Sequence, residues 1–180
     1  MASRGRQARV KGSGQELKLA KLLSAWTGQT FVRVPMSGAN HQQKGEINMI
    51  GDITAPTGSN NSFNYESKKH EAVNVKQVMF NNGEIPSFWE QVVTDSGRVV
   101  DGMLSPMLIF TKNYEPNYVL VPYTEWLVTN LQDKLLPCQV QKTSYVDSVS
   151  KKLQVFDTIL TTLDAVMEFN PDDVFKLTVS

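Results

Sequence analysis

Polar and apolar positions follow two different spacings along the chain. Between Gly14 and Thr27 the apolar residues recur every three or four positions, which predicts a helix that Gly28 ends. Elsewhere, short apolar or alternating runs are bounded by proline, glycine and asparagine, as is typical of strands. We expect strands at 31–35, 47–54, 62–68, 106–111 and 117–121, a helix at 87–96 opened by a Ser-x-x-Glu capping box, and a helix at 123–131.

The order of these elements is helix, three strands, helix, two strands, helix. It predicts an α/β fold in which helices flank a central mixed β-sheet. Residues 137–180 are less regular, although 153–159 alternates like a strand and 162–169 has the pattern of a short helix. No repeat or linker divides the chain, so we expect a single domain over residues 1–180. Residues 1–12 are expected to form a mobile basic arm, and residues 137–180 a C-terminal extension packed on the core.

The strand expected at 62–68 has two chemically different faces. Because strand side chains alternate, Phe63 and Tyr65 are expected on the face that packs inward. Asn64, Glu66 and Lys68 then share the opposite face, which we expect to carry the chemistry.

Asp52 belongs with this second face. It follows an apolar run, and the turn-rich residues 55–61 let the chain reverse, so Asp52 can lie beside Glu66. Two carboxylates and the ammonium of Lys68 at one spot suit a hard divalent cation with a water to be activated beside it, which is nuclease chemistry. The alternative is a solvated Glu–Lys pair on an exposed strand.

Length and composition indicate a soluble globular protein and argue against a membrane-spanning one. With 180 residues, of which 41% are apolar and 20% charged, the chain is sized for one soluble domain, and no run approaches the roughly 18 apolar residues of a membrane span. Cys138 is the single cysteine, which fits a reducing cytoplasm. The net charge is zero, but residues 1–21 carry +5 and residues 151–180 carry −2. A polyanion would therefore meet the N-terminal end, unless the basic segment is a tail of no special purpose.

Four stretches occur in a significant order. They are Lys11-Gly12-Ser13-Gly14-Gln15-Glu16, Arg33-Val34-Pro35-Met36-Ser37-Gly38, Gly51-Asp52-Ile53 and Tyr65-Glu66-Ser67-Lys68. In order and approximate spacing the chain resembles, over about residues 9–121, the PD-(D/E)XK nucleases of the archaeal-type Holliday junction resolvase group. The third stretch reads Gly-Asp-Ile where the family pattern has Pro-Asp-Ile, a departure that keeps the carboxylate.

The resemblance implies a restriction-endonuclease-like fold and a site for Mg²⁺, with Mn²⁺ as a substitute. Asp52, Glu66 and the backbone carbonyl of Ser67 would hold the metal. Glu16 would be a further catalytic residue, and its carboxylate would approach the metal through a water molecule. Lys68 would orient the attacking water or stabilise charge on the phosphate.

DNA contacts are implied for Arg9, Lys11, Arg33, Ser37 and Lys69. Gln91, in the helix expected at 87–96, could face the site as a glutamine does in family members. His41 and His70 lack a second ligand at metal-binding spacing, so we expect them to be solvated or to contact phosphate.

The expected function is a Mg²⁺-dependent deoxyribonuclease, in particular a Holliday junction resolvase or another structure-selective endonuclease. Two symmetric cuts would require a homodimer. Two alternatives stay open: a restriction- or repair-type endonuclease or exonuclease on linear DNA, and a catalytically silent DNA-binding or scaffolding protein. We expect a prokaryotic or phage gene acting in the host cytoplasm, with no membrane partner. No glycine-rich phosphate loop is present, so no nucleotide cofactor is expected.

Overall fold

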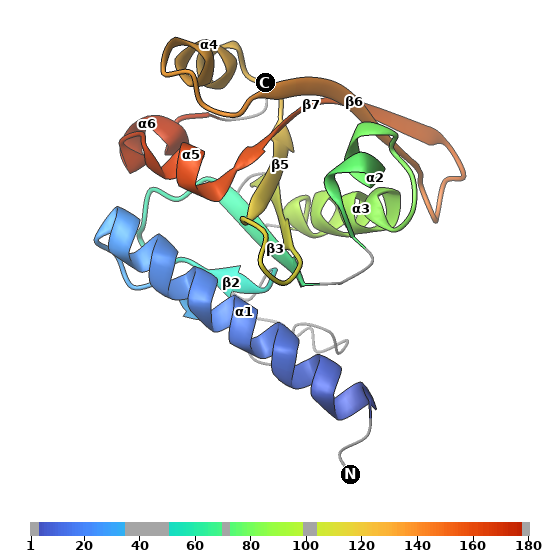
Figure 1. The fold of residues 1–180 in the computed structure, drawn as a ribbon, viewed down its shortest axis with the longest axis horizontal. Helices are drawn as coiled ribbons and strands as arrows, with labels where there is room; N and C mark the ends of the chain where they lie inside the picture. Colours follow the sequence, from blue (N-terminus) through green and yellow to red (C-terminus); the bar gives the residue numbers. More distant parts are fainter. Residues whose placement is uncertain (1–3, 35–50, 70–72, 99–103, 178–180) are drawn as a thin grey trace.

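The computed structural model describes residues 4–34, 51–69, 73–98 and 104–177, with side chains from residue 13 onward. Their centre is a seven-stranded mixed sheet in the order β1-β2-β3-β4-β5-β7-β6 (Figure 1). The strands are β1 (Val32–Arg33), β2 (Ile53–Thr54), β3 (Phe63–Lys69), β4 (Ser105–Thr111), β5 (Tyr118–Pro122), β6 (Gln139–Val146) and β7 (Leu153–Thr162). The helices are α1 (Arg4–Thr27), α2 (Val75–Met79), α3 (Ile85–Ser96), α4 (Glu125–Asp133), α5 (Leu163–Met167) and α6 (Pro171–Phe175). The predicted α/β class with a mixed central sheet is confirmed.

Helices cover both faces of the sheet. On one face, apolar residues of α1, α4, α5 and α6 pack with Tyr65 and Ile109 in a first hydrophobic cluster. On the other face, Trp89 and its neighbours in α2 and α3 pack with Leu108 and Phe110 in a second cluster. The middle strand β4 is buried along its whole length, as a strand covered on both faces must be.

The strand pairing determines where the expected site lies. β3 and β4 run parallel in a register that places Glu66 beside Leu108, and all other neighbouring strands are antiparallel. Ile53 of β2 pairs with Tyr65 of β3. Asp52, the residue before Ile53, therefore lies beside the middle of β3. The expected chain reversal between residues 52 and 66 is therefore present.

The two ends of the chain contain more regular secondary structure than the sequence pattern predicted. Helix α1 begins at Arg4, so residues 4–12 are helical where a mobile arm was expected. The C-terminal extension contributes β6 and β7 to the sheet itself and α5 and α6 to the first cluster. Strand β6 was not predicted, because its exposed and buried positions follow no regular alternation.

The predicted capping box at Ser87 and Glu90 is wrong. Helix α3 already begins at Ile85, and Pro86 occupies the first turn, where proline is favoured. The Ser87 hydroxyl instead donates to the carbonyl of Glu84 (2.9 Å), and a Glu90 carboxylate oxygen accepts from the N–H of Ser148 (2.6 Å). A capping box is present at the start of α2, between Asn74 and Gln77.

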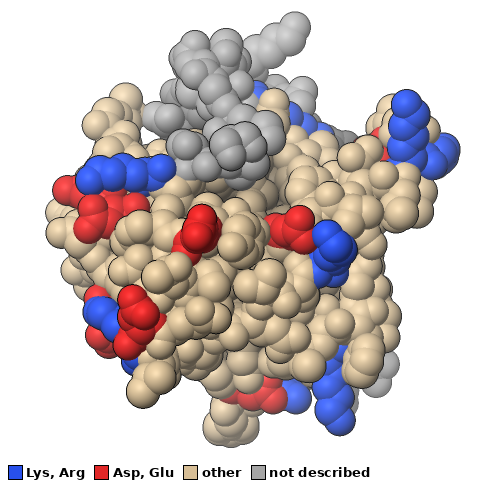
Figure 2. Space-filling view, turned by 90° about the horizontal axis from the view of Figure 1, so that it is seen from above, with Lys and Arg blue, Asp and Glu red and all other residues tan. Residues whose placement is uncertain are grey.

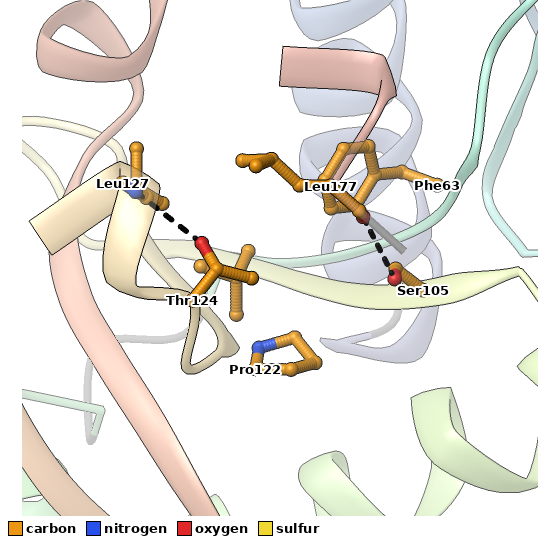
Figure 3. Close-up of a pocket in the computed structure, with 7 residues that line it drawn as sticks. Phe63, Ser105, Pro122, Thr124, Leu127 and Leu177 are labelled. Carbon is orange, nitrogen blue, oxygen red and sulfur yellow. Dashed lines mark hydrogen bonds between the residues drawn. The ribbon is translucent and has the colours of Figure 1, made fainter. Parts of the chain in front are cut away.

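A small apolar pocket lies at the opposite end of β3 from Lys68. Figure 3 shows its lining, which is Phe63, Ser105, Val121, Pro122, Thr124, Leu127 and Leu177. None of these side chains titrates in the physiological range, so we attribute the pocket to packing between the sheet, α4 and the C-terminal residues. Within the described residues, no helix has the length and hydropathy needed to cross a membrane.

Candidate active site

Strand β3 and helix α3 together hold Glu66 and Lys68. Glu66 is buried, and its Oε1 accepts hydrogen bonds from Gln91 Nε2 (2.8 Å) and from Lys68 Nζ. Lys68 Nζ also donates to Gln91 Oε1 (3.0 Å) and lies 5.2 Å from the centre of the Phe88 ring. The ammonium group is therefore fixed between a carboxylate, an amide and an aromatic face.

Backbone hydrogen bonds hold Asp52 against the same strand. Its N–H donates to the carbonyl of Tyr65 (2.9 Å), and its carbonyl accepts from Val34 (2.9 Å). Its side-chain Oδ2 accepts from the N–H of Ser67 (2.8 Å). The Asp52 carboxylate thus contacts the residue between Glu66 and Lys68, so the structure brings these three residues together.

Gly51 explains the departure from the Pro-Asp pattern. Its φ is +76°, a conformation that proline cannot adopt because its ring fixes φ near −65°. A Cβ at this position would lie 2.2 Å from Asn64 Oδ1 and 2.6 Å from the carbonyl oxygen of Tyr65. Only glycine lets the chain approach β3 closely enough to form the Asp52 hydrogen bonds.

Burial and a neighbouring carboxylate both disfavour the charged form of Glu66. The pKa of Glu66 is raised to about 7, first by burial and then by the negative charge of Asp52, with Lys68 opposing the shift. The pKa of Asp95, on α3, is also raised, first by burial and in part by Asp52, while Arg98 lowers it. A cation at this place would relieve the repulsion.

The donor set fits a divalent metal of the magnesium type. Mg²⁺ takes oxygen ligands and needs only one or two carboxylates, which Asp52 and Glu66 would supply, together with the carbonyl of Ser67. Among the described side chains, no group of three or more His, Cys, Asp or Glu residues is close enough to hold a metal. A third carboxylate ligand is therefore not assembled among those residues.

Glu16 and Arg33 form an ion pair with each other. Arg33 Nε donates to Glu16 Oε2, and both side chains are partly buried. The sequence assigned Glu16 to the metal through water and Arg33 to phosphate. Those two roles stay predictions. The ion pair joins helix α1, which carries Glu16, to strand β1, which carries Arg33.

Of the remaining predicted residues, Lys69 is the one whose side chain belongs to the described part of the structure. Lys69 is exposed at the end of β3 and alternates to the face opposite Lys68. Ser37, His41 and His70 lie outside the described residues, as do the side chains of Arg9 and Lys11, whose backbone belongs to α1.

Sequence reasoning missed two residues of α3 near this site. Phe88 contacts the Lys68 ammonium, and Asp95 interacts electrostatically with Asp52 and Lys68. Positions 88, 91 and 95 follow the three- and four-residue spacing of one helix face. That spacing around Gln91 was a signal that could have identified both residues.

Sequence comparisons with known proteins identify a family for this chain. A sequence model of the family described as "Phage putative PDDEXK endonuclease" matches residues 7–176. Protein D14 of Escherichia phage T5 is 28% identical over 131 residues, which cover 71% of this chain and 78% of that protein. No solved structure matches. The narrower grouping with archaeal-type resolvases stays a prediction, whereas the match over nearly the whole chain shows that this protein belongs to the phage PD-(D/E)XK nuclease family.

Proposed function

We propose that this protein is a Mg²⁺-dependent DNA endonuclease that hydrolyses phosphodiester bonds in branched DNA, such as a Holliday junction. The observation that carries the proposal is the arrangement of three residues: Asp52, just before β2, is bonded to β3 beside Glu66 and Lys68, and both carboxylates are buried. Substitution by Mn²⁺ is expected, because both ions accept oxygen ligands.

The two carboxylates and the lysine have different tasks in the proposed reaction. Asp52, fixed by the Ser67 N–H, and Glu66, fixed by Gln91, present carboxylate oxygens. When bound, Mg²⁺ supplies positive charge to the phosphate and lowers the pKa of a water molecule. Lys68 Nζ stabilises the negative charge that develops on the phosphate, and its contacts with Gln91 and Phe88 hold it ready for this.

The test compares cleavage of a four-way junction with cleavage of linear duplex, nicked and single-stranded DNA, in Mg²⁺ and in EDTA. Paired symmetric nicks in the junction alone would support a resolvase. Equal cutting of linear substrates would favour a restriction- or repair-type nuclease or an exonuclease.

Two variants complete this test. Asp52→Ala is expected to lose at least about 10²–10³-fold in rate, the scale of removing one essential electrostatic group. Glu168→Ala, an exposed carboxylate after α5, serves as the control. Absence of metal-dependent cutting by the wild-type protein would favour a silent DNA-binding protein.

A homodimer would align two such sites for symmetric cuts. We propose that the outer face of the β6–β7 hairpin forms its interface. This face carries the exposed residues Val140, Val146, Leu153 and Val155, and an exposed Lys142–Asp157 ion pair. Figure 2 looks down on the end of the molecule where Figure 1 has α4, β6 and β7, and the charged side chains there lie in small separate groups among uncharged residues.

The face of the hairpin, and not its edge, is the better candidate. Asn81 bonds both the N–H (3.1 Å) and the carbonyl (3.0 Å) of Ser144, which blocks strand addition at β6. Light scattering of the wild-type protein and of Leu153→Lys tests the interface. A dimer that this substitution dissociates supports it, and a wild-type monomer rejects it.

A further inference from the structure

The turn between β4 and β5 presents a tyrosine entirely to solvent. Tyr114 has an exposed fraction of 107%, so none of the described residues packs against its ring. Its φ is +65°, a left-handed conformation that glycine adopts freely and that aromatic residues rarely adopt. Burial of the ring therefore does not offset the strain of this conformation.

The turn that carries Tyr114 is held rigidly. The single hydroxyl hydrogen of Thr111 is shared between the carbonyls of Lys112 (3.0 Å) and Glu115 (3.2 Å), and the N–H of Glu115 donates to the Lys112 carbonyl (3.3 Å). An ion pair of 2.7 Å joins Lys112 and Glu115 across the turn. These contacts fix the turn in a backbone conformation that leaves the Tyr114 ring exposed.

The turn lies at the same end of the sheet as the candidate active site. The parallel register pairs Lys68 with Phe110 and Lys69 with Thr111, so the turn begins where β3 ends (Figure 1). After the turn, Asn117 Oδ1 accepts a hydrogen bond from Gln15 Nε2 (2.7 Å) on α1. Gln15 is adjacent to Glu16, so the turn is tied to the helix that carries this candidate catalytic residue.

Leu135 provides an internal comparison. It is also exposed, at 93%, with a positive φ of +55°. Its conformation has a local cause, because it follows α4 and lets the N–H of Leu136 bond the carbonyl of Leu131 (2.9 Å). Leu135 lies beyond the opposite end of β5 from Tyr118, far along the sheet from the site.

We propose that Tyr114 stacks on an unpaired base of DNA bound at the active site. An exposed aromatic face stacks on any base whose face is free, and bases inside a continuous duplex have no free face. The substrate class is therefore DNA with single-stranded or unstacked bases next to the cleaved bond. This inference rests on the proposed nuclease function and adds a means of recognising branched or interrupted DNA.

Binding measurements test the stacking contact. In the full chain carrying Asp52→Ala, which prevents cleavage, fluorescence anisotropy compares continuous duplex with a duplex interrupted by a short single-stranded gap. Adding Tyr114→Ala is expected to weaken binding to the gapped DNA by about 5- to 150-fold, the measured range for one stacked base, and to leave continuous duplex unchanged. Tyr114→Trp should retain the preference, and the matched control Leu135→Ala should change neither affinity.

Glycine at the same two positions separates a DNA contact from a structural role. Tyr114→Gly and Leu135→Gly should both raise the melting temperature by a few degrees, because both relieve a positive φ. Only Tyr114→Gly should weaken binding to gapped DNA. A lower melting temperature for Tyr114→Gly would indicate a structural role and overturn the proposal.

Failure of this inference can be told apart from failure of the proposed function. If the wild-type protein cleaves DNA with Mg²⁺ while Tyr114→Ala binds gapped DNA normally, only the stacking contact is rejected. An equal loss on both DNAs would also reject it. A wild-type protein that neither binds nor cleaves any of these DNAs overturns both proposals.

Discussion

The two faces of β3 are buried to the same extent by contacts of opposite character. On the α1 side, Phe63 and Tyr65 are 4% and 1% exposed, and their rings pack on each other at a centroid distance of 6.3 Å. On the α3 side, Asn64 and Glu66 are 1% and 2% exposed. The first face belongs to an aromatic core. The second face carries buried polar side chains that are hydrogen-bonded to helix α3.

The free energies of the two faces differ accordingly. Burying aromatic rings stabilises the fold, and edge-on ring pairs such as Phe31–Tyr65 add to this. Burying Asn64 and Glu66 removes water from an amide and a carboxylate, and Asn64 Oδ1 has no hydrogen-bond partner among the described residues. Stability is thus concentrated on one face of the strand, and candidate chemistry on the other.

The largest stability effect is expected on the aromatic face. Phe63→Ala should lower the free energy of unfolding by about 3–5 kcal/mol, because the cavity would remain next to Tyr65 and Phe175. Urea unfolding followed by circular dichroism measures this. Phe80→Ala, the same change at an exposed position after α2, is the control, and an equal loss in both variants would contradict the comparison.

Glu66→Gln is expected to raise the free energy of unfolding at pH 8, whereas Phe63→Ala lowers it. Because the folded protein raises the pKa of Glu66 from 4.5 to about 7, it binds this proton more tightly than the unfolded chain does. The stabilisation is complete below pH 4.5 and is lost as the pH rises through 7, a change on the order of 3 kcal/mol. Glutamine cannot ionise, so the variant should be more stable than the wild type at pH 8 while cleaving no DNA.

Metal-free urea unfolding at pH 5 and pH 8 measures this difference. The advantage of Glu66→Gln over the wild type should grow between the two pH values, and added Mg²⁺ should reduce it at pH 8. Glu168→Gln, at an exposed position after α5, is the matched control. A difference that does not depend on pH would disprove the assignment to the Glu66 carboxyl.

A smaller stability effect is expected at Gly51, where the chain next to Asp52 contacts the polar face of β3. Gly51→Ala should destabilise the protein by about 1–3 kcal/mol and reduce cleavage, since its Cβ would collide with Asn64 and with the backbone of Tyr65. Gly28→Ala has a similar φ of +69° but no atom within 4 Å of the added Cβ. The difference in melting temperature between the two variants isolates the collision, and equal melting temperatures would argue against the close approach.

The smallest effect on stability is expected for Gln91→Ala. It removes the amide that holds Glu66 and Lys68 but leaves both charged groups in place. Cleavage should fall about 10- to 100-fold, as when a residue that orients a metal ligand is removed, while thermal unfolding stays nearly unchanged. Thr94→Ala, exposed on the same helix, should retain full activity. Wild-type rates for Gln91→Ala would exclude the positioning role.

The sequence by itself determined what depends on neighbouring residues. Alternation assigned Phe63 and Glu66 to different faces of one strand, and the turn residues between Asp52 and Glu66 predicted the reversal that brings them together. Strand periodicity and turn formation follow from local backbone geometry, so one sequence suffices to recognise them. The positive φ of Gly51, in contrast, was found only in the structure.

Only the tertiary structure decided which distant groups meet. The clamp of Gln91 on Glu66, the Glu16–Arg33 pair and the insertion of β7 between β5 and β6 join segments that the sequence leaves far apart. The predicted capping box failed for the same reason, because Glu90 bonds the β6–β7 turn and not its own helix. Such contacts depend on how whole elements pack, and the free energy of packing is not encoded in the spacing of neighbouring residues.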